Sequence, residues 1–205
     1  IVSIAGFAKL LRRGDLDEEQ KQEYLAIIEE EALRLAAMAT NVLNLTRVEN
    51  QSILTEVSSY NLSEQLRSCI LLLVDKWEKK RLDFKLDFNE YTIEANEELL
   101  KQVWINLFDN AIKFSPEGGK VEVRIHNRSD RIRIEIINEG EEIGREEQRK
   151  IFNKFYQGDS SHSVEGNGIG LSIARQVVKL HKGRICVQSD KGLTVFTVEL
   201  PVKSI

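Results

Sequence analysis

The stretch QVWINLFDNAIKF, residues 102–114, has the spacing of an amphipathic helix with an unusual polar face. Its apolar row recurs every four residues and extends one turn upstream: Leu99, Val103, Leu107 and Ala111. Another face carries Asn106, Asn110 and Lys113. Asparagine weakens a helix interior, whereas its amide oxygen is a suitable ligand for Mg²⁺, which also takes phosphate oxygens. The helix therefore predicts a magnesium and phosphate site, with solvated amides on an exposed face as the alternative.

A glycine-rich segment, GNGIGL at residues 166–171, runs directly into another amphipathic helix. Gly166, Gly168 and Gly170 allow close approach of the backbone to a phosphate, and a helix N-terminus offers free N–H groups. A polar stretch rather than a strand precedes the glycines, and no GxxxxGK[ST] is present, so Rossmann and P-loop sites are disfavoured. A purely structural glycine turn is the alternative.

Around these two helices the sequence alternates helices with strands from residue 62 onward. The spacing predicts helices at 62–80, 96–114, 144–154 and 170–181, and strands at 82–88, 120–126, 131–138, 184–189 and 194–200. The two-residue period is plainest in 120–126 and 131–138, joined by a turn at 127–130. This order predicts an antiparallel or mixed sheet covered on one face. Residues 157–165 are polar and aperiodic, and we expect a mobile loop there.

Residues 1–54 have the pattern of a helical hairpin. A first helix ends near Gly14, and Asp17 with Gln20 resembles a capping box that starts a long second helix. The second helix has two apolar rows, of which one needs a further partner: Leu25, Ala32, Ala39 and Leu43. A dimeric four-helix bundle would cover both rows, and packing of the hairpin against the rest of the chain is the alternative.

The composition describes a folded chain without a signature for nucleic acid. The 205 residues include 29 Lys and Arg against 33 Asp and Glu, and no long basic run occurs, so no nucleic-acid partner is expected. Cys69 and Cys186 lie far apart without a CxxC, which argues against a disulfide framework or a zinc site. His126, His162 and His181 lack ligand spacing. No run of 18 apolar residues is present, so we expect membrane attachment only through segments absent from this sequence.

Five ordered motifs resemble those of sensor histidine kinases. NLFDNAIKF, NEGEEI, IFNKFYQ, GNGIGLSIARQVVKLHKG and GLTVFTVELP are similar to the N, first glycine, F, second glycine and terminal boxes, and LNLTRVEN resembles the end of the dimerisation and phosphotransfer domain. The resemblance implies a dimerising helical hairpin over 1–56 and, over 62–205, an α/β two-layer sandwich of the histidine kinase/gyrase-type ATPase class. It also implies ATP and Mg²⁺ as cofactors, a homodimer, a cognate response regulator as partner, and the cytoplasmic portion of a membrane-anchored bacterial protein.

The same resemblance assigns roles to individual residues. Asn106 and Lys113 match catalytic positions, Lys113 as a phosphate contact, and Asn110 matches the Mg²⁺ ligand. The remaining matches are to nucleotide contacts and the lid over them: Asn138, Gly140, Ile143, Phe152, Phe155, Gly166, Gly168, Gly170, Leu171 and Thr194. Three positions depart from the family pattern, because Asn138 replaces an aspartate that binds the adenine amino group and Glu142 and Leu193 replace glycines.

Three activities are compatible with these motifs. A histidine kinase would bind ATP–Mg²⁺ and transfer its γ-phosphoryl group to a histidine and then to a response-regulator aspartate. The family's phosphoacceptor histidine lies six residues before the position matched by Ile1, so we expect this chain not to autophosphorylate. A gyrase-type ATPase usually has a glutamate at the position of Asn106 to activate water. Asparagine cannot act as that base, so the kinase is favoured over the ATPase. A non-catalytic nucleotide-binding regulatory dimer is favoured by Asn138 and Glu142.

Overall fold

The computed structural model describes residues 2–14, 16–50, 53–128, 130–158 and 168–202. The chain divides into two compact units, Ile1–Asn44 and Leu45–Ile205. Among the described helices, none combines the length and apolar character that a membrane span requires.

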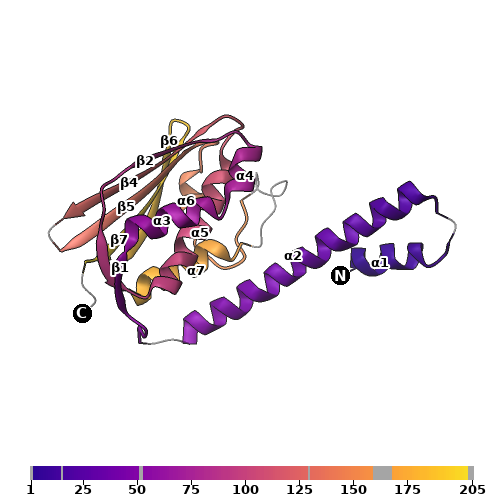
Figure 1. Cartoon of the computed structure of the whole chain (residues 1–205), viewed down its shortest axis with the longest axis horizontal. Helices are drawn as coiled ribbons and strands as arrows, with labels where there is room; N and C mark the ends of the chain where they lie inside the picture. The colour runs from indigo at the N-terminus through magenta and orange to yellow at the C-terminus, as the bar shows by residue number, and fades with distance from the viewer. Residues whose placement is uncertain (1, 15, 51–52, 129, 159–167, 203–205) are drawn as a thin grey trace. The chain divides into compact units, whose positions relative to one another are not determined.

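The first unit is a helical hairpin. It consists of α1 (Val2–Leu11) and most of α2 (Glu18–Asn50), and Figure 1 shows α1 running back beside the first half of α2. The predicted capping box is confirmed, because Gln20 N donates to Asp17 Oδ1 at 2.8 Å and Asp17 N donates to Gln20 Oε1 at 3.3 Å. The rings of Phe7 and Tyr24 pack between the two helices with centroids 5.0 Å apart.

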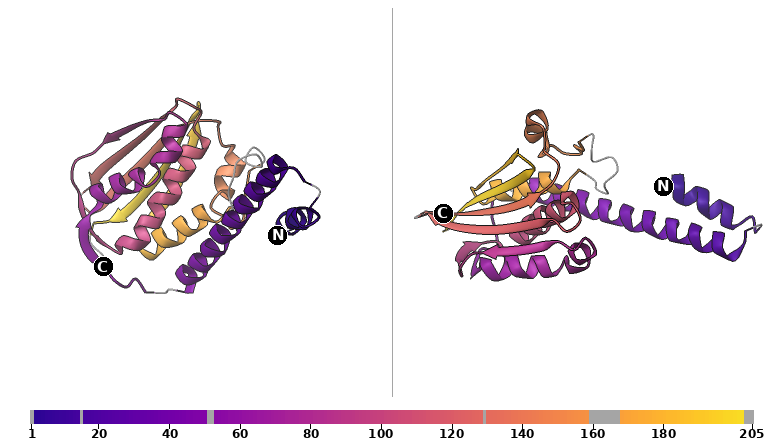
Figure 2. Two further views of the ribbon diagram at one scale, coloured as in Figure 1. Left: turned by 45° about the vertical axis from the view of Figure 1, so that its right-hand side comes forward. Right: turned by 90° about the horizontal axis from the view of Figure 1, so that it is seen from above.

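The second unit is a two-layer α/β sandwich, as predicted. Its five-stranded sheet has the order β2-β4-β5-β7-β6, with only β2 and β4 parallel: β2 (Asp83–Asp87), β4 (Lys120–Arg128), β5 (Arg131–Glu139), β7 (Leu193–Pro201) and β6 (Arg184–Asp190). Three helices cover one face of this sheet (Figures 1 and 2): α3 (Leu62–Leu71), α5 (Glu97–Phe114) and α7 (Gly170–Leu180).

The two faces of the sheet differ in polarity. The face under the helices is buried and apolar: Val121, Val123, Ile125, Ile132, Ile134, Ile136, Phe196, Val198 and Leu200. The opposite face carries cross-strand ion pairs, including Arg133 with Glu199 at 2.6 Å and Lys85 with Glu122 at 2.9 Å. This alternation follows from the two-residue side-chain period of the strands.

Three elements differ from the sequence expectation. The single helix expected at 62–80 is two, α3 and α4 (Val74–Lys79), because the carbonyl of Ile70 accepts from Leu73 N and from the Trp77 indole. The helix expected at 144–154 is only α6 (Arg145–Lys150), and Phe155 beyond it has a φ of +61°. A short antiparallel pair, β1 (Ser58–Asn61) with β3 (Thr92–Ala95), was not predicted.

Candidate functional site

Helix α5 is held at both ends, which fixes the polar face predicted from its sequence. At its N-terminus the side chain of Asn96 accepts from Leu99 N at 2.9 Å. At its C-terminus the Lys80 ammonium donates to three backbone oxygens, those of Ile112 at 3.0 Å, Lys113 at 2.7 Å and Ser115 at 2.9 Å. A cation at this end also complements the helix dipole.

The polar face of α5 meets the start of α7. Asn110 Nδ2 donates to Asn106 O at 2.8 Å, so the amide oxygen is the Asn110 atom suited to a metal. A Cβ on Gly170 would lie 2.7 Å from Asn106 Oδ1, so only glycine fits there without displacement. Asn106, Asn110 and Lys113 are all half-buried. The structure thus places Asn106 of α5 next to Gly170 at the start of α7.

The glycine segment also has a structural reason for its composition. Gly168 has a φ of +62°, and a Cβ there would lie 2.7 Å from Tyr156 O. Its carbonyl accepts from Phe155 N at 2.9 Å. Gly166 lies outside the described residues, as do residues 159–165 of the predicted loop. The turn at Gly168 therefore requires glycine whether or not a phosphate binds.

Asn138 and Thr194 lie opposite each other on β5 and β7, on the helix-covered face of the sheet. Both are buried, and Asn138 Nδ2 donates to Glu139 O at 3.0 Å. A Cβ on Gly140 would lie 2.5 Å from Phe114 O, so this glycine lets the end of α5 approach the end of β5. Gly140, next to the predicted purine contact Asn138, and Gly170, a predicted phosphate contact, therefore both approach the C-terminal half of α5.

The remaining predicted residues have different surroundings. Phe152 packs edge-on against Phe196 with ring centroids 6.4 Å apart, whereas Phe155 is 59% exposed. Leu171 packs against the hydrophobic core. Ile143 is half-buried, and both polar groups of its backbone are bound by side chains.

Three residues of this region were not found from the sequence. Lys80 lies between other charged residues, and only the fold brings it to the end of α5. Ser189 and Gln148 bind the backbone of Ile143 from β6 and α6. A period-2 reading of β6 places Ser189 on the inner face, which is the one signal that could have identified it.

Two titratable residues have structural roles. His181 Nδ1 lies 2.8 Å from Val177 O, and its Nε2 accepts from Asn96 N at 3.2 Å, which requires the neutral tautomer with a proton on Nδ1. Burial lowers the pKa of His181. Burial raises the pKa of the Cys69 thiol to about 11. Both shifts favour the uncharged form at neutral pH.

No cluster of three His, Cys, Asp or Glu side chains suited to a metal occurs in the described parts of the chain. A magnesium ion at α5 would therefore depend on amide, phosphate and water oxygens, which is a donor set that Mg²⁺ accepts.

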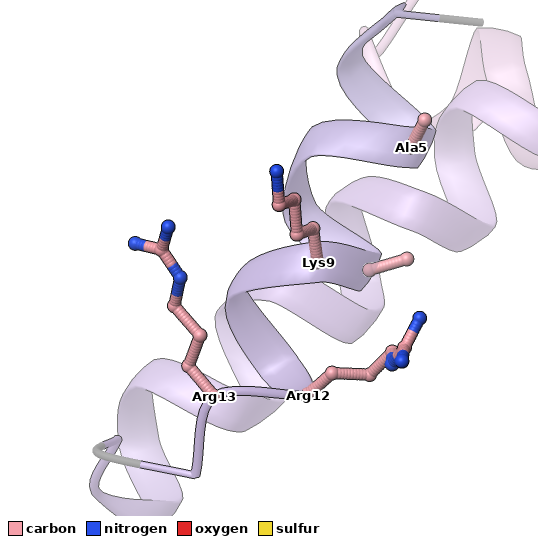
Figure 3. Close-up of a pocket in the computed structure, with 5 residues that line it drawn as sticks. Ala5, Lys9, Arg12 and Arg13 are labelled. Atoms are coloured by element: carbon pink, nitrogen blue, oxygen red, sulfur yellow. The ribbon is translucent and has the colours of Figure 1, made fainter.

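Surface hollows occur in the first unit, which contains none of the candidate site residues named above. Figure 3 shows one beside α1, where Lys9, Arg12 and Arg13 project in different directions. Ala5 and Ala8 complete its lining. Another lies on α2: Leu35, Met38, Ala39, Val42 and Leu43. The first hollow is lined by α1 and the two residues after it, and the second by α2 alone, so neither has the convergent polar groups of a small-molecule site.

Comparison with protein families agrees with this arrangement. A family model described as Histidine kinase-, DNA gyrase B-, and HSP90-like ATPase matches residues 95–204. A second, described as His Kinase A (phospho-acceptor) domain, matches residues 1–51.

Similar proteins include several named sensors. Drug sensory protein A of Synechocystis sp. is 36% identical over 92% of this chain and 30% of its own length. Circadian input-output histidine kinase CikA of Synechococcus elongatus is 29% identical over 100% of this chain and 28% of its own length. The chain thus spans under a third of the length of these two relatives.

A crystal structure of histidine kinase ThkA in complex with response regulator protein TrrA matches 97% of this chain and 56% of that chain, with a TM-score of 0.79 and 29% identity. The catalytic domain of ThkA alone matches with a TM-score of 0.66 and 31% identity over 73% of this chain and 98% of that chain. Together with the hairpin, the sandwich and the α5–α7 site, these matches show that the chain belongs to the sensor histidine kinases, as a catalytic core in which a phospho-acceptor-type segment precedes an ATPase domain.

Proposed function

We propose that the ATPase domain binds ATP with Mg²⁺ and transfers the γ-phosphoryl group to a histidine, from which it passes to a response-regulator aspartate. The observation that supports this most directly is the contact of the α5 polar face with the start of α7, where Gly170 abuts Asn106. Backbone N–H groups at the start of α7 can bind phosphate oxygens there, and Lys113 can offset their charge.

In the transfer, a nitrogen of the acceptor imidazole attacks the γ-phosphorus in line, and the bond between that phosphorus and the β–γ bridging oxygen breaks. ADP leaves with the bridging oxygen and its electron pair. The protein's contribution is positioning and charge neutralisation, which Asn106 and Lys113 supply from α5. Asn110 Oδ1 would hold Mg²⁺, which when bound neutralises phosphate charge.

The purine ring would lie by the end of β5. Asn138 Oδ1 would accept from the adenine amino group, Thr194 and Ile143 would contact the ring, and Gly140 would allow the approach of α5. Phe152 and Phe155 would support the lid over the nucleotide, and Gly168 and Leu171 would shape its hinge.

Two further assignments belong to the same proposal. Residues 1–56 would form a dimeric four-helix bundle, supported by exposure of the α2 row that the hairpin leaves uncovered, in which Leu43 is 69% exposed. Residues 62–205 would be the independent catalytic domain. The ThkA complex, which matches 97% of this chain, supports a response regulator as partner. The use of ATP as a substrate supports a cytoplasmic location for this part of the protein. We place it in a membrane-anchored bacterial sensor.

Calorimetry with a non-hydrolysable ATP analogue, with and without Mg²⁺, tests the site. Asn110→Ala should weaken binding and reduce its magnesium dependence, because the ligand oxygen is lost. Asn127→Ala is the control, since Asn127 is exposed at the end of β4. Equal affinity and equal magnesium dependence in wild type and Asn110→Ala would place the metal elsewhere.

We also propose that the 205-residue chain does not label itself with γ-labelled ATP. Residues 1–51, which match the phospho-acceptor domain, contain no histidine, and the three histidines of the chain lie at 126, 162 and 181. A protein extended upstream to include a histidine should acquire acid-labile, base-stable label. Labelling of the 205-residue chain itself would contradict the proposal.

A further inference from the structure

We propose that Ser189 and Gln148 are positioning residues that make the purine site selective for adenine over guanine. This inference rests on the proposed function, because it concerns the base of the nucleotide bound beside Asn138 and Thr194.

Ser189 and Gln148 together bind both polar groups of the Ile143 backbone. Ile143 N donates to Ser189 Oγ at 2.9 Å, and Gln148 Nε2 donates to Ile143 O at 2.7 Å. Gln148 Nε2 also donates to Ser189 O at 3.1 Å, so α6, the Ile143 loop and β6 are joined at one point. The loop that carries Ile143 is therefore held at a fixed position relative to the sheet.

The Ser189 side chain is also hydrogen-bonded to the side chain of Thr194. The two hydroxyl oxygens lie 2.9 Å apart, and the residues are direct partners across β6 and β7. Thr194 is in turn the direct partner of Asn138 across β7 and β5. The row Asn138, Thr194 and Ser189 is 2%, 4% and 7% exposed, so its hydrogen-bond directions are set by the protein rather than by bulk water.

The positions of the hydroxyl protons in this row determine what it presents to a base, because either hydroxyl of the Ser189–Thr194 pair could be the donor. A serine hydroxyl has one proton, and Ser189 Oγ already accepts from Ile143 N. If Ser189 gives its proton to Thr194 Oγ1, the Thr194 proton is directed to the ligand as a donor. Asn138 Nδ2 is bound to Glu139 O, which assigns its oxygen to the ligand as an acceptor.

A donor beside an acceptor matches adenine, whose N1 accepts and whose N6 amino group donates. Guanine presents the reverse pair, N1–H and O6, and would face an unmatched donor and an unmatched acceptor. Buried unmatched polar groups discriminate more strongly than added contacts. In this arrangement Ser189 sets the direction of the Thr194 hydroxyl. Gln148 holds the Ile143 backbone in place, so that Ile143 N keeps its hydrogen bond to Ser189 Oγ.

The test compares dissociation constants for Mg²⁺ complexes of adenosine and guanosine imidotriphosphates and of inorganic tripolyphosphate. Ser189→Ala should reduce the adenine-to-guanine preference roughly tenfold, the equivalent of about one hydrogen bond, while tripolyphosphate binding stays unchanged. Ser189→Thr keeps the hydroxyl and should restore most of the preference. Gln188→Ala, on the opposite face of the same strand, should match wild type.

Gln148→Met removes the donor from a half-buried position and should lower the preference less, so it tests the inference even if Ser189→Ala does not fold. A wild type that prefers adenine, with Ser189→Ala and Gln148→Met equally selective, would overturn the inference and leave the proposed function intact. Equal weakening of all three ligands would also overturn it, because that is the result of structural damage alone. A wild type that binds none of the three would instead refute the proposed function.

Discussion

Replacing Lys80 by Met removes the cation that caps α5 while keeping the length of the side chain. The ammonium donates to three backbone oxygens over 2.7–3.0 Å, and the site is partly buried. One charge-assisted hydrogen bond contributes roughly 1.5–3 kcal/mol, and the three bonds share one group and are not additive. Water can replace part of the loss at a helix end, so we expect destabilisation of about 2 kcal/mol, or a Tm lower by roughly 4–8 °C.

Urea unfolding followed by tryptophan fluorescence measures this change. Both tryptophans, Trp77 and Trp104, lie in the second unit, so the signal reports the sandwich. Lys79→Met removes the same charge from an exposed side chain one residue earlier and should change stability by less than about 0.5 kcal/mol. Equal midpoints for Lys80→Met and Lys79→Met would refute the capping argument.

Three other changes test separate features. Gly140→Ala would place a Cβ 2.5 Å from Phe114 O and should cost about 1–3 kcal/mol and weaken ATP-analogue binding; unchanged calorimetry and melting would contradict this. Because burial lowers the pKa of His181, the unfolded chain binds its proton first, so wild-type stability should fall as pH drops below about 6.5. His181→Gln should show a smaller fall in urea midpoint over that range, and an identical fall would exclude His181 as the cause. Leu43→Glu on the exposed row of α2 should shift light scattering from dimer to monomer, whereas Gln22→Glu should not; a wild-type monomer would refute the bundle.

The sequence was most informative where side-chain period and burial coincide. Alternation in β4 and β5 predicted the core of the sheet because each strand buries one face. The pair β1 and β3 escaped prediction because each strand has four residues, too few to establish a period.

The residues after α7 show what a local pattern leaves out. The helix ends at Leu180, close to the predicted end at 181, and Lys182 adopts the left-handed conformation with a φ of +55°. Gly183 is required for a contact that is distant in sequence, because a Cβ there would lie 2.5 Å from Glu199 O, on β7. Contacts between distant segments, like those of Lys80 and Ser189, depend on the fold and leave no local pattern.

The position of β2 at one edge of the sheet has a consequence for behaviour at high concentration. An edge strand offers unpaired backbone groups to which another molecule can add a strand. The β2 sequence places Asp83, Lys85 and Asp87 on the face opposite the helices, and Lys85 is bound to Glu122. A second strand arriving at this edge would have to desolvate these charges, so β2 is protected against intermolecular sheet growth and amyloid-like aggregation.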